Sequence, residues 1–190
     1  MQRVASTVIQ TRQGGAVERC HNIPHTRRYS TGQHQWGVAM LMHALWPEDF
    51  PRLALICLTH DVPEGWVGDI PSPTLRSIDP EARRQIMLIE QRIARDLDLP
   101  HDLDLSPEDA QKVRFCDLVE LLLWCMEEQA MGNTYVADCR YTLEEYLSTS
   151  ELPPGGHEFL YALEGRSIVP RSAGVVSHAA RWALAEERKS

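Results

Sequence analysis

The amino-acid sequence predicts an all-α protein that folds as a single-domain helical bundle. Two observations indicate this: apolar residues recur at helical spacing, and helix start and stop signals are frequent while strand signals are scarce. With 190 residues, 43% hydrophobic and 24% charged, the chain has the length and composition of one globular domain. We expect this domain to cover residues 1–190, with a core at about 12–150 and C-terminal helices at about 156–188.

The first half of the chain contains two apolar stretches and one amphipathic stretch. Residues 35–45 have helical character, and residues 53–58 form a short apolar run. Within residues 80–97, isoleucine and leucine recur every third or fourth position among charged residues, which predicts an amphipathic surface helix. Residues 71–73 read Pro-Ser-Pro, from which we expect a stiff extended turn.

The second half begins with a strong helix start. Ser106 suits the N-cap, Pro107 suits the first turn, and the acidic residues after them suit the positive end of the helix dipole. We expect this helix to continue until the Gly-Asn pair at 132–133 stops it, with another helix at about 136–147. Residues 153–156 read Pro-Pro-Gly-Gly and break the chain before two last helices, which carry no signal of a site.

The charge and the cysteines limit the classes of function. A net charge of −8 argues against a nucleic-acid polymer as the main ligand, because such binding uses a broad basic surface. A small anionic substrate is compatible, since a metal and a few local cations can reverse the field inside one pocket. The five cysteines lack metal-binding spacing and are expected to be reduced core thiols. No membrane span or secretory signal is apparent, so we expect a cytoplasmic protein.

His60 and Asp61 form the most informative feature, an imidazole and a carboxylate that close the apolar run at 53–58. Charged groups at the edge of a buried segment are costly to desolvate unless something compensates them, and a bound metal cation often does. His34 and Asp117 lie on two further apolar segments. Such a set suits a divalent ion of intermediate softness with open coordination positions. Taken singly, each residue could instead be satisfied by the backbone or a local partner.

The order of these four residues resembles that of the HD-domain phosphohydrolase superfamily, whose ligands are a His, a His-Asp pair and a distant Asp. Its deoxynucleotidase branch also has an Arg fifteen positions before the first His, as Arg19 stands before His34, and a Glu and an Asp after the pair, as Glu64 and Asp69 stand here. Residues 15–25 further resemble phage-type dATP triphosphohydrolases. The resemblance implies an HD-type bundle with one divalent transition-metal ion, such as Co, Mn, Zn or Ni, with Mg possible.

The resemblance also implies a role for each candidate residue. Glu64 and Asp69 would serve as the catalytic acid and base, and Arg19 would grip the phosphate through its guanidinium fork. The metal would polarise the phosphorus and lower the pKa of a bound water. A polar, basic and aperiodic loop follows Arg19 and forms the expected pocket wall. The further substrate-binding candidates in this loop are Cys20, His21, Ile23, Arg27 and Arg28, and His25 could add to their positive charge.

Two positions depart from the family pattern. Many monophosphatases of the branch have Trp where this chain has Cys20, and since that Trp crowds the sugar, discrimination of deoxyribose stays open. Many relatives have Glu where this chain has Gln33, a neutral amide. Glu120, one helical turn after Asp117, could support a metal ligand. The tryptophans that could stack on a base, or simply fill the core, are Trp36, Trp66 and Trp124.

We therefore expect a phosphohydrolase that cleaves the bond between the 5′ oxygen and the α-phosphorus of a deoxynucleotide. The leading substrate is a dNTP, dATP above all, giving deoxynucleoside and triphosphate. The alternative is a deoxyribonucleoside 5′-monophosphatase (a 5′-nucleotidase), which breaks the same bond. A non-enzymatic alternative is a helical regulatory or scaffold protein with a decayed site. We also expect a homo-oligomer, in the host cytoplasm if phage-encoded, with no nucleic-acid or membrane partner.

Overall fold

Helices form all the regular structure in residues 1–164, the part of the chain that the computed structural model describes. In chain order they are α1 (Gln2–Gly14), α2 (Thr31–Leu45), α3 (Phe50–Thr59), α4 (Glu64–Val67), α5 (Ser72–Ser77), α6 (Pro80–Asp96), the 3₁₀ helix η1 (Asp102–Asp104), α7 (Pro107–Ala130), α8 (Ala137–Thr149) and α9 (Gly156–Leu163). None of these helices combines the length and apolarity needed to cross a bilayer. The all-α prediction is confirmed.

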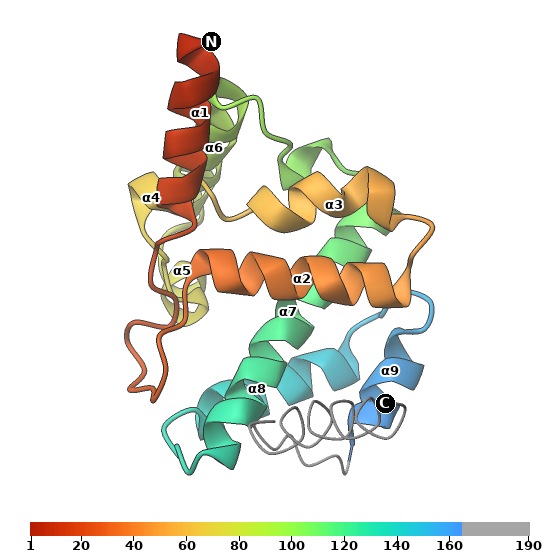
Figure 1. Cartoon of the computed structure of the whole chain (residues 1–190). Helices are drawn as coiled ribbons and strands as arrows, with labels where there is room; N and C mark the ends of the chain where they lie inside the picture. Colours follow the sequence, from red (N-terminus) through yellow and green to blue (C-terminus); the bar gives the residue numbers. More distant parts are fainter. Residues whose placement is uncertain (165–190) are drawn as a thin grey trace, which may run out of the picture.

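The core lies around α7. Helix α2 packs against both α3 and α7, while α8 packs against α7 from the C-terminal side (Figure 1). Side chains buried between α2, α3 and α7 include Val38, Met42, Ile56 and Cys116. A second buried group gathers around the C-terminal half of α7 and α8 and includes Tyr29, Trp124, Leu143 and Leu147. Because α7 contributes to both groups, it is the central helix of the described part.

Local signals explain where the main helices begin and end. The Ser106 hydroxyl accepts a hydrogen bond from the Asp109 backbone N–H at 3.2 Å, so the predicted N-cap of α7 is confirmed. Gly132 follows the end of α7 with a φ of +90°, a conformation that favours glycine. Helix α6 is capped by Asp79 and lies on the surface as expected, but it buries only Ala94, and Ile89 of the predicted apolar stripe is 49% exposed.

Two regions differ from the sequence expectations. Helix α1 was not predicted; of its residues only Gly14 is buried, and its apolar side chains Val4, Val8 and Ile9 are exposed. The expected extended turn at residues 71–73 is wrong beyond Pro71, because α5 begins at Ser72 and accommodates Pro73 in its first turn. Of the two helices expected after residue 156, α9 is present, and the other lies outside the described residues.

The end of α1 lies directly against the turn that carries the His-Asp pair. A Cβ atom on Gly14 would lie 2.5 Å from the carbonyl oxygen of Val62, so no larger residue fits there. A Cβ on Gly65 would in turn lie 3.0 Å from the Cα of Gly14. This close approach brings the loop that follows α1 next to His60 and Asp61.

Candidate active site

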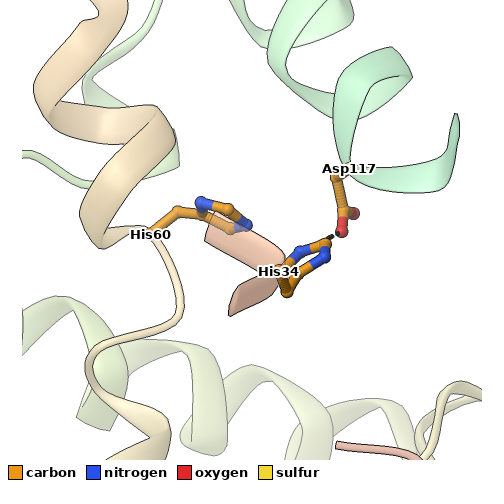
Figure 2. A group of neighbouring side chains, drawn as sticks. All are labelled: His34, His60 and Asp117. Carbon is orange, nitrogen blue, oxygen red and sulfur yellow. Dashed lines mark ion pairs between the residues drawn. The ribbon is translucent and has the colours of Figure 1, made fainter. Parts of the chain in front are cut away.

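His34, His60 and Asp117 come from three elements and meet in one cluster. His34 lies in the first turns of α2, His60 is the C-cap of α3, and Asp117 lies near the middle of α7. Figure 2 shows the three side chains turned toward one another. One ligand atom from each lies within 4.8 Å of the others, and Nε2 of His34 is 3.1 Å from Oδ1 of Asp117.

Asp61 adds its carboxylate to the same cluster. Its Oδ2 lies 3.5 Å from Nε2 of His34 and 3.4 Å from Nε2 of His60. The same oxygen accepts a hydrogen bond from the guanidinium of Arg19. The structure thus brings together all four residues that were expected as metal ligands, with Asp61 shared between the histidines and an arginine.

Both histidine rings present a buried nitrogen that lacks a hydrogen-bond partner. Among the described residues, Nε2 of His34 and Nε2 of His60 are buried without one. The other nitrogen of each ring is engaged: Nδ1 of His60 lies 3.2 Å from the carbonyl oxygens of Ile56 and Cys57, and Nδ1 of His34 pairs with Glu120. Unpaired buried nitrogens are unfavourable, and a divalent transition-metal ion would take up both lone pairs. The donor set fits such an ion.

The carboxylate of Asp117 gives the cluster a negative charge that can bind a cation. Burial raises the pKa of Asp117, yet the imidazole of His34, with Nε2 3.1 Å from Oδ1, and the charge of Arg114 hold it below its ordinary value. Burial and the Arg19 charge lower the pKa of His34, but Asp117 and Glu120 outweigh them and raise it to about 9. Asp117 is therefore ionised at neutral pH, and a metal ion would compete with the proton on His34.

Arg19 lies in the loop after α1 and points into the cluster. Its side chain is only 11% exposed, and besides Asp61 it approaches Oε2 of Glu64 at 3.7 Å and Oδ1 of Asp117 at 3.9 Å. Its backbone N–H donates to the carbonyl oxygen of Tyr29 at 2.8 Å, which fixes the chain at this point. A guanidinium held among three carboxyl groups can exchange one of them for a phosphate, which has similar acceptors.

Glu64, the first residue of α4, lies beside Arg19 and has a side chain that is 15% exposed. Burial and the charge of Asp61 raise its pKa to about 9, while Arg19 acts in the opposite direction. The Thr31 hydroxyl donates to its Oε2 at 3.3 Å. The raised pKa favours the protonated form of Glu64 in the metal-free protein, which is the form that a general acid needs.

Asp69 has a different environment from Glu64. Its Oδ2 accepts a hydrogen bond from the backbone N–H of Cys20 at 2.9 Å and lies 3.8 Å from Nδ1 of His21. Cys20 has a φ of +53°, which is uncommon for a residue other than glycine. Asp69 thus holds the start of the loop in this conformation, directly after Arg19.

The structure does not bring the other loop candidates into the cluster. Arg27 pairs with Glu127 at 2.5 Å, and Nε of Arg28 lies 3.2 Å from Oε2 of Glu18. Ile23 packs against the buried group around α7 and α8. These contacts hold the loop on the protein surface, so a role of these residues in substrate binding would require their present partners to be exchanged.

Tyr29 is a site residue that the sequence did not single out. It is fully buried, its hydroxyl donates to the carboxylate of Glu120, and that hydroxyl lies 3.2 Å from Nδ1 of His34. Its ring stacks on Trp124 with the centroids 4.6 Å apart. An aromatic residue directly before the N-cap of α2, at the end of a polar loop, is the signal that could have identified it.

The three tryptophans have different surroundings. Trp124 is buried in the stack with Tyr29, so it belongs to the core. Trp36 and Trp66 are 63% and 48% exposed. Of these three candidates, only Trp36 and Trp66 are exposed enough for a base to reach them.

A helical bundle that gathers two histidines, two aspartates and an arginine around one point has the site of an HD-type metal-dependent phosphohydrolase. Comparison with known proteins narrows this class. Residues 14–161 match the family described as 5′-deoxynucleotidase YfbR-like, and the chain belongs to this family. The expected membership of the deoxynucleotidase branch is thereby confirmed, and the chain is a hydrolase of the HD type.

Two relatives indicate the range of activities in the family. The dATP triphosphohydrolase of Salmonella phage PMBT28 is 30% identical over 129 residues, which cover 58% of this chain and 61% of the phage protein. The 5′-deoxynucleotidase YfbR of Salmonella typhi is 26% identical over 147 residues, which cover 73% of this chain and 68% of YfbR. The match thus spans about three fifths of the phage relative.

Two solved structures share the fold. The cyanophage S-2L HD phosphohydrolase DatZ, bound to dA and one catalytic Zn²⁺ ion, gives a TM-score of 0.61 at 20% identity, covering 81% of this chain and 91% of DatZ. The PH0347 protein of Pyrococcus horikoshii OT3 gives a TM-score of 0.65 at 17% identity, covering 83% and 96%. The expected HD-type helical domain is confirmed.

Proposed function

We propose that this chain cleaves the bond between the 5′ oxygen and the α-phosphorus of a deoxynucleotide, using one divalent transition-metal ion. The observation that carries the proposal is the pair of buried, unpartnered Nε2 atoms of His34 and His60 beside the carboxylates of Asp61 and Asp117. These four residues would hold the ion. When bound, it would supply Lewis-acid polarisation of the phosphate and a water of lowered pKa.

Arg19 would bind and orient the α-phosphate. It reaches the same cluster from the loop after α1, and its guanidinium presents several donors in a fixed plane that matches phosphate oxygens. Because its side chain is buried and its backbone is held by Tyr29, the guanidinium is preorganised rather than recruited from solvent.

Glu64 would act as the general acid. In the step, the oxygen of a water forms a bond to phosphorus, the bond from phosphorus to the 5′ oxygen breaks, and the 5′ oxygen takes the proton of Glu64. The raised pKa of Glu64 in the metal-free protein supports this, since it favours the protonated form that a general acid needs. The proton released by the water needs an acceptor, for which the family pattern suggests Asp69.

The leading substrate is a dNTP, dATP above all, cut in one step to deoxyadenosine and triphosphate. The phage relative, 30% identical, supports this choice. A deoxyribonucleoside 5′-monophosphatase is the second candidate, and a specific observation favours it: Arg27 and Arg28 are paired with Glu127 and Glu18 and so offer no free charge for further phosphates in this conformation.

Product analysis tests the proposal. Metal-supplemented protein is incubated with dNTPs, NTPs and dNMPs, and the phosphorus products are identified by ³¹P NMR, with Asp61→Ala as the inactive reference and Asp138→Ala, an exposed change on α8, as the matched control. We expect triphosphate from dATP. Faster cleavage of dAMP would favour the monophosphatase, release of orthophosphate or pyrophosphate from dATP would favour another hydrolase, and no turnover of any substrate would favour a binding protein.

We also propose that the chain forms a homo-oligomer. Apolar side chains such as Val8 and Ile9 on α1 and Ile89 on α6 are about half exposed, at 61%, 57% and 49%, on two helices that lie at one end of the structure (Figure 1). Exposed apolar surface of this kind is common at subunit contacts. Light scattering on the full chain measures the subunit number.

A further inference from the structure

Glu120 links α7 to the imidazole of His34. One carboxylate oxygen, Oε2, accepts hydrogen bonds from Nδ1 of His34 and from the hydroxyl of Tyr29. The Tyr29 hydroxyl also lies 3.2 Å from the same nitrogen. His34 and Tyr29 are fully buried, and the Glu120 side chain is 13% exposed. The three groups therefore form one compact network behind the cluster.

This contact determines which nitrogen of His34 can bind a metal. An ionised carboxylate can only accept hydrogen bonds, so its partner Nδ1 must carry the proton. In the neutral imidazole that binds a metal, the lone pair is then on Nε2, the nitrogen that faces Asp61 and Asp117. A histidine ligand whose second nitrogen donates to a carboxylate is both oriented and made more basic.

His60 reaches the same tautomer by a different route. Its Nδ1 lies 3.2 Å from the backbone carbonyl oxygens of Ile56 and Cys57, one turn earlier in α3. The backbone cannot be changed by substitution of a side chain, whereas the partner of His34 can. The orientation of His34 thus depends on a single side chain from another helix.

Gly37 supplies the space that Glu120 needs. It lies one turn after His34 on α2, where glycine is unfavourable for a helix. A Cβ atom at this position would lie 2.6 Å from Cγ and 3.0 Å from Oε1 of Glu120. Because the nearest atom is Cγ rather than the end of the side chain, a methyl group would displace the carboxylate as a whole.

We propose that Glu120 is a positioning residue for His34, and that Gly37 and Tyr29 hold its carboxylate in place for that task. The inference rests on the proposed function, because it assumes that Nε2 of His34 binds the metal. It assigns Glu120 no contact with substrate. It predicts that metal affinity, and not only folding, depends on this contact.

Cobalt binding by folded variants tests the inference. The full chain is prepared metal-free as wild type and with single changes, and the dissociation constant for Co²⁺ is measured by competition with a chromophoric chelator, together with the visible absorption of bound Co²⁺. The variants are Glu120→Ala, Glu120→Gln, Gly37→Ala and Tyr29→Phe. Glu144→Gln, which removes a carboxylate paired with Arg140 on α8, is the matched control.

We expect Glu120→Ala and Gly37→Ala to bind Co²⁺ about 10-fold to 100-fold more weakly, with a shifted absorption band. Gly37→Ala is the more specific test of the two variants, because it keeps the negative charge of Glu120 and only moves the carboxylate. Alanine also favours the helix more than glycine does. Glu120→Gln should lose less affinity, because its amide oxygen can still accept the Nδ1 proton. Tyr29→Phe should have the smallest effect, and Glu144→Gln should match the wild type.

The possible failures are distinguishable. If wild-type protein does not bind Co²⁺, the proposed function fails. If the wild type binds but Glu120→Ala and Gly37→Ala match it in affinity and absorption, the inference is overturned. If Glu120→Ala does not fold, Gly37→Ala and Glu120→Gln still test the inference. ¹⁵N NMR of the Zn²⁺-loaded protein gives a second test. We expect the His34 proton on Nδ1, and a proton on Nε2 would contradict the inference.

Discussion

The carboxylate of Glu128 accepts hydrogen bonds from both the backbone N–H of Thr26, at 2.7 Å, and its hydroxyl, at 2.9 Å, across 102 positions of the chain. Glu128 is fully buried, and the side-chain amide of Asn133 donates to it at 2.8 Å. Burial raises the pKa of Glu128, but these donors outweigh it and lower the pKa. This one charged group ties the loop that begins at Arg19 to the end of α7.

Replacing Glu128 by alanine should therefore destabilise the protein strongly. The change leaves the donors of Thr26 and Asn133 unsatisfied in a buried place, and we expect the free energy of unfolding to fall by about 3 kcal/mol. Urea denaturation measures it, with the exposed Glu144→Ala as control. A loss no larger than that of the control would show that the loop is held by other contacts.

Wild-type protein should bind about one divalent ion per chain, and Asp61→Ala should lose most of it. Asp61 contributes an oxygen within 3.5 Å of both histidine nitrogens. Elemental analysis after dialysis gives the stoichiometry, with Asp138→Ala on α8 as the matched control. Equal retention by Asp61→Ala and wild type would remove Asp61 from the ligand set.

Glu64→Gln should lose turnover while it keeps the metal. The amide has nearly the same shape, but it cannot give a proton to the 5′ oxygen, and general acids typically contribute about 10² to 10⁴ in rate. Turnover of dATP and metal content are measured on the same preparation. An undiminished rate in the metal-loaded variant would exclude Glu64 from the mechanism.

Without metal, the same substitution should stabilise the fold at alkaline pH. The pKa of Glu64 is about 9 in the folded protein and about 4.5 when unfolded. Between these values the unfolded state has lost a proton that the folded state keeps, so the free energy of unfolding falls as the pH rises. Glu64→Gln has no carboxyl group at this position, so its free energy of unfolding does not fall in this way. In EDTA, its Tm should exceed that of wild type by several degrees at pH 8 and much less at pH 5; a difference that does not grow with pH would contradict the raised pKa.

Arg19→Lys should weaken substrate binding more than it slows turnover. Lysine keeps the charge but offers a point donor in place of a planar fork. We expect KM for dATP to rise about tenfold, with a smaller change in kcat and unchanged metal content. Steady-state kinetics measure both constants. A fall in kcat at constant KM would instead place Arg19 in the chemical step.

The fold was predictable where local chemistry determines it. Ser106 and Pro107 specify the start of α7 by themselves, so the predicted N-terminus of this helix agrees with the structure to the residue. Helix α1 could not be predicted in this way, because its start has neither a capping side chain nor an acidic residue in the first turn. The Pro-Ser-Pro sequence at 71–73 was ambiguous, since proline suits both an extended turn and the first turn of a helix.

Within the site, sequence order and resemblance selected residues that the structure gathers, but they could not assign partners across the chain. Arg27 and Arg28 look like free cations in the sequence, and only the fold shows that Arg27 meets Glu127, 100 positions later. Tyr29 carries no charge and belongs to none of the motifs that predict the site. Its importance arises from burial against Glu120 and Trp124, which only the tertiary structure shows.

His60 hydrogen-bonds to the carbonyls of Ile56 and Cys57, so the last turn of α3 holds the imidazole in its orientation. Helix ends open transiently far more often than a whole domain unfolds. Each opening at this end would release the ring from its orientation. With His60 as a metal ligand, as proposed, the lifetime of a bound ion would be tied to the fraying of one helical turn, and metal exchange should share a rate-controlling motion with amide hydrogen exchange at residues 56–60.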